Sequence, residues 1–499
     1  MGRAKKARTV TGIEVTEAVP ALSWLTPRRV IVFLVAWLAL FGLGSILVSN
    51  PFVSETTAGA TPDYWHVMYL HGLLIGMAGL IALVALEMFE GICSTHVRTG
   101  ILVGVIVATV LTTTGGIFDR RIPGDEIPRW IHIIGAFSLD GILILLILGL
   151  AQGWCARLQS SPTLPFLVAW MASISMLIAA VMGHIGGWTL EFNNHPRLLG
   201  SWANLAGESL DKLRDNLTGS HSHEMVVASM ALVLAGAVHR FGYPGAAGIS
   251  RSVSRLGMSM VGLGVFSMTC LYVTMAVTSW VVPSFFQSAH GTNGLAGDDI
   301  LTGVLVMGGG LLALWPLVPG VIDRARSWTE SSLAIAAAWV WTAIMIGVPI
   351  SGYWIELHET FYGSGNAKAP GALNDAIYTW VHQDIALFLL PALFAILLLS
   401  DRLVAPRCKG FIAWMAMAGV AMLLVGGGIW AFVSPVVHGA GYALSTTGLL
   451  LVGSSIAVAI RSACRQREQR DKRRNPPFRR SAEDDHPDKR PAPAIRSSV

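Results

Sequence analysis

Residues 66–89 read HVMYLHGLLIGMAGLIALVALEMF, an apolar run whose only carboxylate, Glu87, stands near its end. A helix that crosses a bilayer needs about 20 mainly apolar residues, so this run is long enough to span. Eleven more runs of similar composition occur at 29–49, 99–118, 129–151, 165–187, 222–240, 256–282, 299–321, 332–352, 378–400, 411–434 and 443–461. We therefore predict an all-α, polytopic transmembrane helix bundle of about 12 spans.

The overall composition agrees with a membrane protein. Apolar residues make up 53% of the chain and charged residues only 13%, whereas soluble domains usually carry about 25% charged residues. A lipid bilayer must therefore cover much of the surface. The basic residues flank the apolar runs, a pattern that concerns membrane topology. The formal charge of +5 therefore does not indicate a nucleic-acid partner.

The distribution of Lys and Arg predicts the orientation. With the N-terminus inside, the outer segments hold only seven of the 35 basic residues: Arg120, Arg121, Arg129, Arg197, Lys212, Arg214 and Lys368. The positive-inside rule asks for this bias. We therefore predict that both termini are cytoplasmic and that the chain lies in a plasma membrane, of the bacterial inner-membrane type. The predicted organisation is a basic head (1–28), a membrane domain (29–461) and a disordered basic tail (462–499).

The cysteines fit the same topology. Cys93, Cys155, Cys408 and Cys464 fall on the inner side, and Cys270 lies within a predicted helix. Reduced thiols are the expected state in the cytoplasm. No outer pair is left to form a disulfide.

The histidines gather at the opposite face. Eleven of the 14 fall at or near the outer face: His66, His71, His132, His184, His195, His221, His223, His290, His358, His382 and His438. Several of these lie inside apolar runs rather than in loops. Polar side chains at such depth are costly and usually functional, although hydrogen bonding at the membrane interface is the competing explanation for any single one.

Two of these histidines occupy matching depths. His71 lies about one and a half turns into its run, and His382 lies one turn into the tenth run. Both runs go from outside to inside, and imidazole is the usual axial ligand of haem iron in a helix bundle. We therefore predict that His71 and His382 hold a low-spin haem. Gly72 and Gly76 supply the small residues that a haem face pressed against a helix favours.

A second cluster follows at Ser220–Met225. His221 is a candidate ligand of a second haem, and three other histidines are candidate ligands of copper or non-haem iron: His184, His223 and His290. Glu224 is a candidate acceptor that would orient a ligand histidine. Asp140, near the middle of its run, is either a proton-path group or a partner for a neighbouring helix.

These positions carry a resemblance to a known family. Histidines on the second, sixth and tenth of 12 spans resemble subunit I of the haem–copper oxidases, a superfamily that includes the nitric oxide reductases. The matching stretches are Leu70-His71-Gly72-Leu73-Leu74-Ile75-Gly76-Met77, Val381-His382-Gln383-Asp384, His223-Glu224-Met225-Val226 and Ala289-His290-Gly291. The piece from His221 to Met225 also resembles the NnrS-type haem- and copper-containing membrane family.

The resemblance implies an oxidoreductase of electron transport. It implies reduction of oxygen or nitric oxide at an outer-face metal site, with electrons from an outer-face cytochrome, a cupredoxin or quinol, and with small partner subunits. The chain departs from the family at three places. Gly291 follows His290 in place of a second histidine, Trp380 precedes His382 where a His-x-His pair would stand, and no tyrosine follows His223 on the sixth span.

Other functions remain open on the sequence alone. Asp140 and Asp384 would couple protons in a 12-span transporter, although no half-repeat of the kind found in transporters is evident. A non-catalytic assembly or nitric-oxide-tolerance protein would use the histidines only at the interface. A metal site without haem is the remaining alternative.

Overall fold

The computed structural model describes residues 25–49, 64–89, 93–118, 127–157, 164–192, 200–201, 203–204, 209–242, 249–278, 303–314, 328–362, 385–432 and 438–474. Within these ranges the fold is helical and contains no strand, which confirms the all-α prediction. The main helices are α1 (Pro27–Ser49), α3 (Tyr64–Met88), α4 (Thr95–Phe118), α5 (Ile127–Arg157), α6 (Leu164–Phe192), α8 (Leu210–Ala237), α9 (Ile249–Thr278), α11 (Gly309–Leu314), α13 (Trp328–Tyr362), α15 (Leu390–Leu403), α16 (Pro406–Phe432) and α17 (His438–Arg474). Short π-helical segments extend α8 (η2, Val238–Gly242) and precede α11 (η4, Val304–Gly308).

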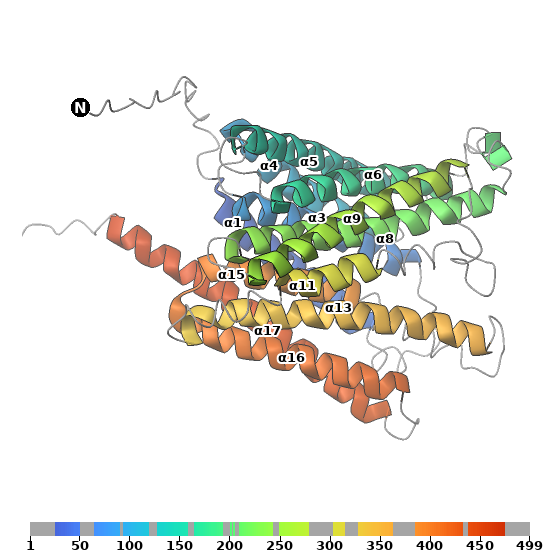
Figure 1. The fold of residues 1–499 in the computed structure, drawn as a ribbon. Coiled ribbons are helices and arrows are strands. Elements are labelled where there is room, and N and C mark those ends of the chain that lie inside the picture. The colour runs from blue at the N-terminus through green and yellow to red at the C-terminus, as the bar shows by residue number, and fades with distance from the viewer. Residues whose placement is uncertain are drawn as a thin grey trace, which may run out of the picture.

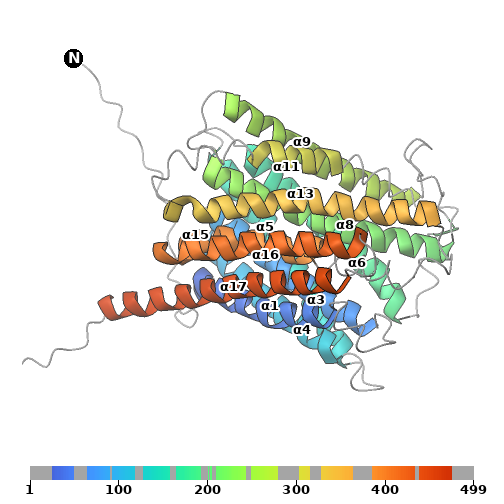
Figure 2. The same cartoon turned by 90° about the horizontal axis from the view of Figure 1, so that it is seen from below.

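Each predicted apolar run overlaps one of these helices. Within the described ranges, nine helices are long and apolar enough to cross a membrane, and two shorter apolar helices cover Val304–Leu314 and Ile385–Asp401. The long axes run side by side in Figures 1 and 2. The helices therefore suggest a multi-pass membrane protein, and the count of 12 spans stays a prediction.

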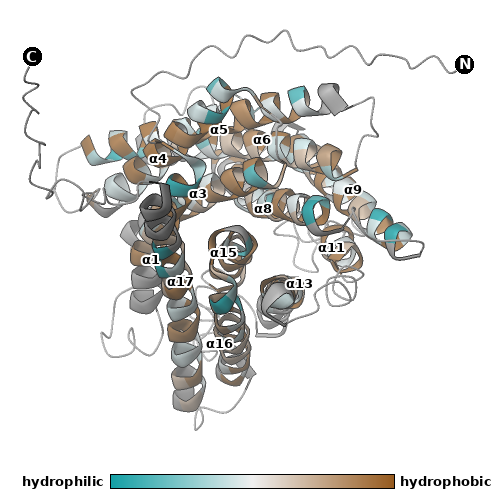
Figure 3. Ribbon diagram, turned by 90° about the vertical axis from the view of Figure 1, so that its left-hand side faces the viewer, coloured by the Kyte–Doolittle hydropathy of each residue, from teal (hydrophilic) through white to brown (hydrophobic). Residues whose placement is uncertain are grey.

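The helices surround two central ones. Viewed along the bundle, α3 and α8 lie inside an arc formed by α4, α5, α6 and α9, and α15 lies near the centre on the other side (Figure 3). Helix α3 is apolar on all sides, and 83% of its spanning window is buried. A helix that is apolar all round is typically a buried one. This arrangement places the N-terminal part of α3 among several neighbouring helices.

Polar contacts identify one end of the bundle. Arg28 Nη2 donates hydrogen bonds to the carbonyl oxygens of Ala463 (2.9 Å) and Leu403 (3.4 Å), which joins α1 to α17 and α15. Glu87 pairs with Arg98 where α3 passes to α4. At the end of α15, Asp401 pairs with Lys409 (2.8 Å) and Arg240 (3.9 Å). The start of α1 and the end of the apolar part of α17 therefore share this end, which we call the basic end. Its assignment to the cytoplasm stays a prediction.

The C-terminal helix is longer than predicted. Helix α17 continues to Arg474 and projects beyond the bundle in Figures 1 and 2, so the predicted disordered tail at 462–499 began too early. Residues 461–474 contain neither Pro nor Gly and are rich in Arg, Lys, Gln and Glu, which are good helix formers. Pro476 and Pro477 follow shortly afterwards, and a proline disfavours the helical conformation at the residue before it.

Candidate histidine site

Four histidines and one aspartate converge at the end of the bundle opposite the basic end. They are His71 on α3, His132 and Asp140 on α5, His184 on α6 and His221 on α8, and we call them the histidine cluster. The structure thus brings together three of the histidines that the sequence singled out and adds His132. His184 bonds to Asp140, and its neighbour on α6, Gly183, lies against the His221 ring.

A relay of hydrogen bonds fixes the protonation of His71. His132 Nδ1 lies 3.0 Å from the backbone carbonyl oxygen of Thr112, and His132 Nε2 lies 2.9 Å from His71 Nδ1. A carbonyl oxygen only accepts, so Nδ1 of His132 must donate to it. In a neutral ring the other nitrogen then accepts, and Nδ1 of His71 must donate in turn. The lone pair of neutral His71 therefore stands on Nε2, which makes no hydrogen bond to any described residue.

This relay depends on a close approach of α4 to α5. A Cβ at Gly115 would lie 2.5 Å from the backbone nitrogen of His132 and 2.6 Å from the carbonyl oxygen of Pro128. A Cβ at Gly135 would lie 2.7 Å from the backbone nitrogen of Thr112. Only glycine leaves room for backbones at such distances. The two glycines thereby bring His132 within reach of the Thr112 carbonyl.

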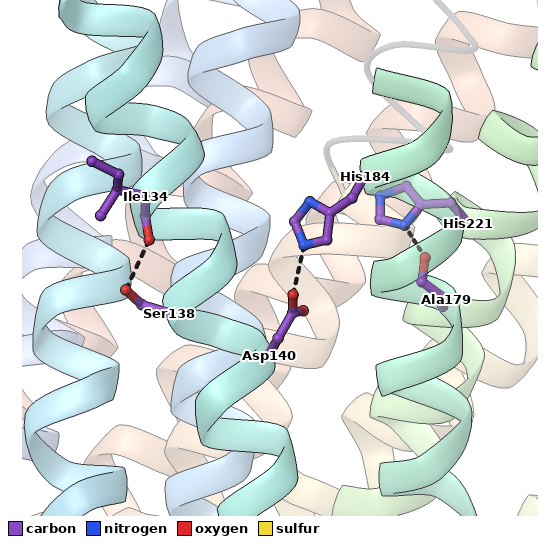
Figure 4. A network of polar contacts seen from close by, with 6 residues as sticks. All are labelled: Ile134, Ser138, Asp140, Ala179, His184 and His221. Atoms are coloured by element: carbon purple, nitrogen blue, oxygen red, sulfur yellow. Dashed lines mark hydrogen bonds and ion pairs between the residues drawn. The ribbon is translucent and has the colours of Figure 1, made fainter. Parts of the chain in front are cut away.

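His221 is held in a similar way from the other side of the cluster. Its Nδ1 lies 2.8 Å from the carbonyl oxygen of Ala179 on α6 (Figure 4). Nδ1 therefore donates, and the lone pair of the neutral ring stands on Nε2, which makes no hydrogen bond to any described residue. Gly183 lies one turn further along α6, and a Cβ there would collide with the His221 ring. Glycine at this position makes the space that the imidazole occupies.

The third part of the cluster is the pair His184–Asp140. His184 Nε2 lies 2.8 Å from Asp140 Oδ2, and the two side chains reach across from α6 and α5 (Figure 4). The imidazole stacks on Phe137, with ring centroids 4.4 Å apart. The other carboxylate oxygen, Oδ1, is buried and has no hydrogen-bond partner among the described residues. Asp140 thus has the interhelical partner that one sequence interpretation expected.

Two further site predictions have different partners from those expected. Glu224 Oε1 accepts a hydrogen bond from Ser175 Oγ at 2.8 Å, and Ser175 in turn accepts one from Thr269 at 2.8 Å. Glu224 thus bonds to a serine of α6 rather than to a ligand histidine. His223 Nδ1 donates to the carbonyl oxygen of Gly219, one turn back on its own helix, at 2.9 Å. His221 and His223 consequently bond to different helices.

The glycines after His71 do not form a haem cradle, and this expectation was wrong. A Cβ at Gly72 would lie 2.8 Å from the carbonyl oxygen of Thr112, and one at Gly76 would lie 2.8 Å from Leu38 Cδ2. Both glycines are buried against neighbouring helices, α4 and α1. Their small size serves helix packing instead.

Three of the predicted site residues, His290, His382 and Asp384, lie outside the described residues. Within the ranges that are described, no group of three or more His, Cys, Asp or Glu side chains is arranged to hold a metal ion. The cluster does offer the chemistry of an axial haem ligand, because a ligating histidine normally binds through one ring nitrogen and donates the other N–H to a nearby acceptor. His71 and His221 both meet that condition.

Sequence reasoning noted His132 among the deep outer histidines but gave it no role, and it passed over Gly115 and Gly183. The signal for His132 was its depth, which is shared with His71. Comparison with protein-family models, curated proteins and solved structures found no match to this chain. The class that the fold defines is a multi-pass helical bundle with a histidine cluster at one end.

Proposed function

We propose that this chain is a membrane haem protein of the electron-transport class, with His71 as an axial ligand. The observation that carries the proposal is the relay Thr112–His132–His71, which fixes the lone pair of His71 on Nε2. Haem, when bound, supplies one-electron chemistry. The chain's own residues hold the imidazole in one tautomer and one orientation, and both are requirements for a stable axial ligand.

The surroundings of His71 support the same function. Helix α3 is enclosed by other helices, and Leu73, half a turn from His71, is fully buried. The degree to which the protein encloses a haem ligand is one of the factors by which it sets a reduction potential. On this proposal the histidine cluster lies at the outer face of a plasma membrane. Electrons arrive there from a cytochrome, a cupredoxin or quinol, and oxygen or nitric oxide is the substrate of a second metal site.

A visible spectrum of the purified chain tests the proposal. The full chain is expressed with haem in supply, solubilised in detergent, and measured dithionite-reduced minus air-oxidised, together with a pyridine haemochrome assay. We expect sharp reduced α and Soret bands that disappear in His71→Ala. His96→Ala is the matched control, because His96 is an exposed histidine at the basic end of α4. A correctly inserted but colourless chain, or an unchanged spectrum in His71→Ala, would refute the proposal.

One observation favours a second candidate, a proton-coupled transporter. Asp140 is paired with His184 inside the bundle and keeps one buried carboxylate oxygen without a partner among the described residues. Ionisable groups at such depth often belong to proton relays. A transporter would be colourless and would acidify or alkalinise the lumen of liposomes on addition of its substrate, and Asp140→Asn would abolish that signal. No such proton movement is expected of the haem protein without an electron donor.

A further inference from the structure

A direct hydrogen bond joins His71 to His132, whereas His71 and His221 are in ring contact without a hydrogen bond. The His71 and His132 ring centroids are 5.1 Å apart, and facing nitrogens of these rings are 2.9 Å apart in a direct hydrogen bond. The His71 and His221 centroids are 6.1 Å apart, which is 1.0 Å wider (6.1 − 5.1). Unlike His71 and His132, His71 and His221 are not joined by a hydrogen bond. An ion that bridges two imidazoles bonds each nitrogen at about 2.0 Å, so it holds the two ring centroids further apart than a direct hydrogen bond does.

The hydrogen bonds of the two rings point to the same use. Each ring donates its Nδ1 proton to an acceptor on another helix, His132 for His71 and Ala179 for His221. Each is left with the Nε2 lone pair and no hydrogen-bond partner for it among the described residues. Both side chains keep part of their surface accessible. A pair of neutral imidazoles with oriented lone pairs is a donor set for iron or copper.

The angle between the rings is compatible with this use. The planes of His71 and His221 are inclined at 72°. Two ligands on opposite sides of one ion touch only through the metal, so their planes are free to rotate relative to each other. Edge-to-face packing of two rings is the alternative explanation of the same angle and distance, and the experiment below separates the two.

We propose that His71 and His221 ligate one metal ion through their Nε2 atoms, from α3 and α8. This inference rests on the proposed function for the identity of the metal as haem iron. It goes beyond that function in assigning the second ligand to His221 on α8 instead of His382 on the tenth span. His132 and the Ala179 carbonyl hold the two rings, and Gly183 makes room for the second.

Four variants of the full chain test the assignment: His71→Ala, His221→Ala, His382→Ala and the control His96→Ala. We expect His71→Ala and His221→Ala each to abolish the low-spin haem spectrum, and His382→Ala and His96→Ala to keep it. Loss in His382→Ala together with retention in His221→Ala would overturn the inference and leave the proposed function intact. If His221→Ala keeps the low-spin spectrum, whatever the other variants show, the His71 and His221 rings are only packed edge to face and share no metal ion.

His221→Met guards against a variant that simply fails to fold. Methionine is itself an axial ligand and raises the reduction potential of a haem that it shares with histidine. We expect His221→Met to bind haem and to titrate at a higher potential than the unaltered chain. An unchanged potential would contradict the inference. Size-exclusion chromatography and far-ultraviolet circular dichroism in detergent confirm the fold of each variant.

A chain that carries no haem is tested with copper(I) alone. Copper is titrated under reducing conditions against a competing chelator, and binding is measured for the unaltered chain and for the same four variants. Binding of one equivalent of copper(I), with an affinity at least about tenfold lower in both His71→Ala and His221→Ala but unchanged in His96→Ala, would support the shared site even after the haem proposal had failed. An unchanged copper affinity in His221→Ala would overturn the shared site.

Discussion

The two ends of the bundle hold their helices together with different chemistry. At the basic end, charged side chains meet carboxylates and carbonyls, and the Glu87–Arg98 pair keeps 19% and 43% of its two side chains exposed. At the other end, the contacts between helices are mostly hydrogen bonds of buried or half-buried imidazoles to neutral acceptors, set at fixed spacing by glycines, and the one carboxylate, Asp140, accepts from His184. Charge is tolerated where side chains reach water, whereas neutral donors with matched acceptors cost less where they do not. The basic end should therefore tolerate substitution better than the histidine cluster does.

The largest effect is expected from Gly115→Ala. The added Cβ would meet the backbone of His132 and Pro128, which cannot rotate away as a flexible side chain would. We expect a loss of about 1–3 kcal/mol in the free energy of unfolding, as for other overpacked positions. Gly141→Ala on the neighbouring helix α5 is the control, because a Cβ there meets nothing within 4 Å. Denaturant unfolding in detergent measures both, and equal stability of the two variants would contradict the close approach of α4 to α5.

A smaller loss is expected for Arg28→Ala. Its guanidinium donates to two carbonyl oxygens, and hydrogen bonds from charged groups contribute about 1.5–3 kcal/mol when well formed. Because Arg28 is only partly buried, we expect the free energy of unfolding to fall by about 1 kcal/mol in the same assay. Arg465→Ala, an exposed arginine on the extended part of α17, should leave stability unchanged. A loss as large as that of Gly115→Ala would mean that the two ends do not differ as described.

The smallest energetic effect is expected for Glu87→Gln. Ion pairs with a substantially exposed partner contribute about 0–1 kcal/mol and weaken with salt. We expect at most about 0.5 kcal/mol at low ionic strength and no difference from the unaltered chain in 1 M salt. An effect that persisted at high salt would show that the pair is screened from solvent more than its exposure indicates.

Thiol labelling checks which membrane face the basic end occupies. Cys93 and the exposed Cys464 both lie at this end, so a membrane-impermeant maleimide should reach them in inverted vesicles and not in right-side-out cells. Burial raises the pKa of the Cys93 thiol, and the nearby Arg98 lowers it to a smaller extent. A raised pKa leaves less thiolate near pH 7, so Cys93 should react several-fold more slowly than Cys464, and its rate should climb as the pH rises. Labelling from the outer face would reverse the predicted topology.

The sequence predicted correctly the features that depend only on position along a helix. The apolar runs located the helices, and the positions of His71, His184 and His221 along their runs predicted that they share one end. Depth along a helix does not say which helices are neighbours, because side-chain packing decides that. His132 was therefore overlooked as the partner of His71. The glycines beside His71 were misinterpreted for the same reason, since their contacts with α4 and α1 follow from the rotation of α3.

The apolar composition of α3 limits which contacts can set the rotation of this helix within the bundle. Lipid tails are as apolar as leucine, so an apolar helix gains little from the hydrophobic effect when it leaves lipid for a protein interior. Because α3 is apolar on every side, hydrophobicity also gives it no preferred rotation about its own axis. Shape and polar contacts must set that rotation. The bond from His71 to His132, with the close contact of Gly72 against the Thr112 carbonyl, fixes the angular register of the whole helix from near one of its ends.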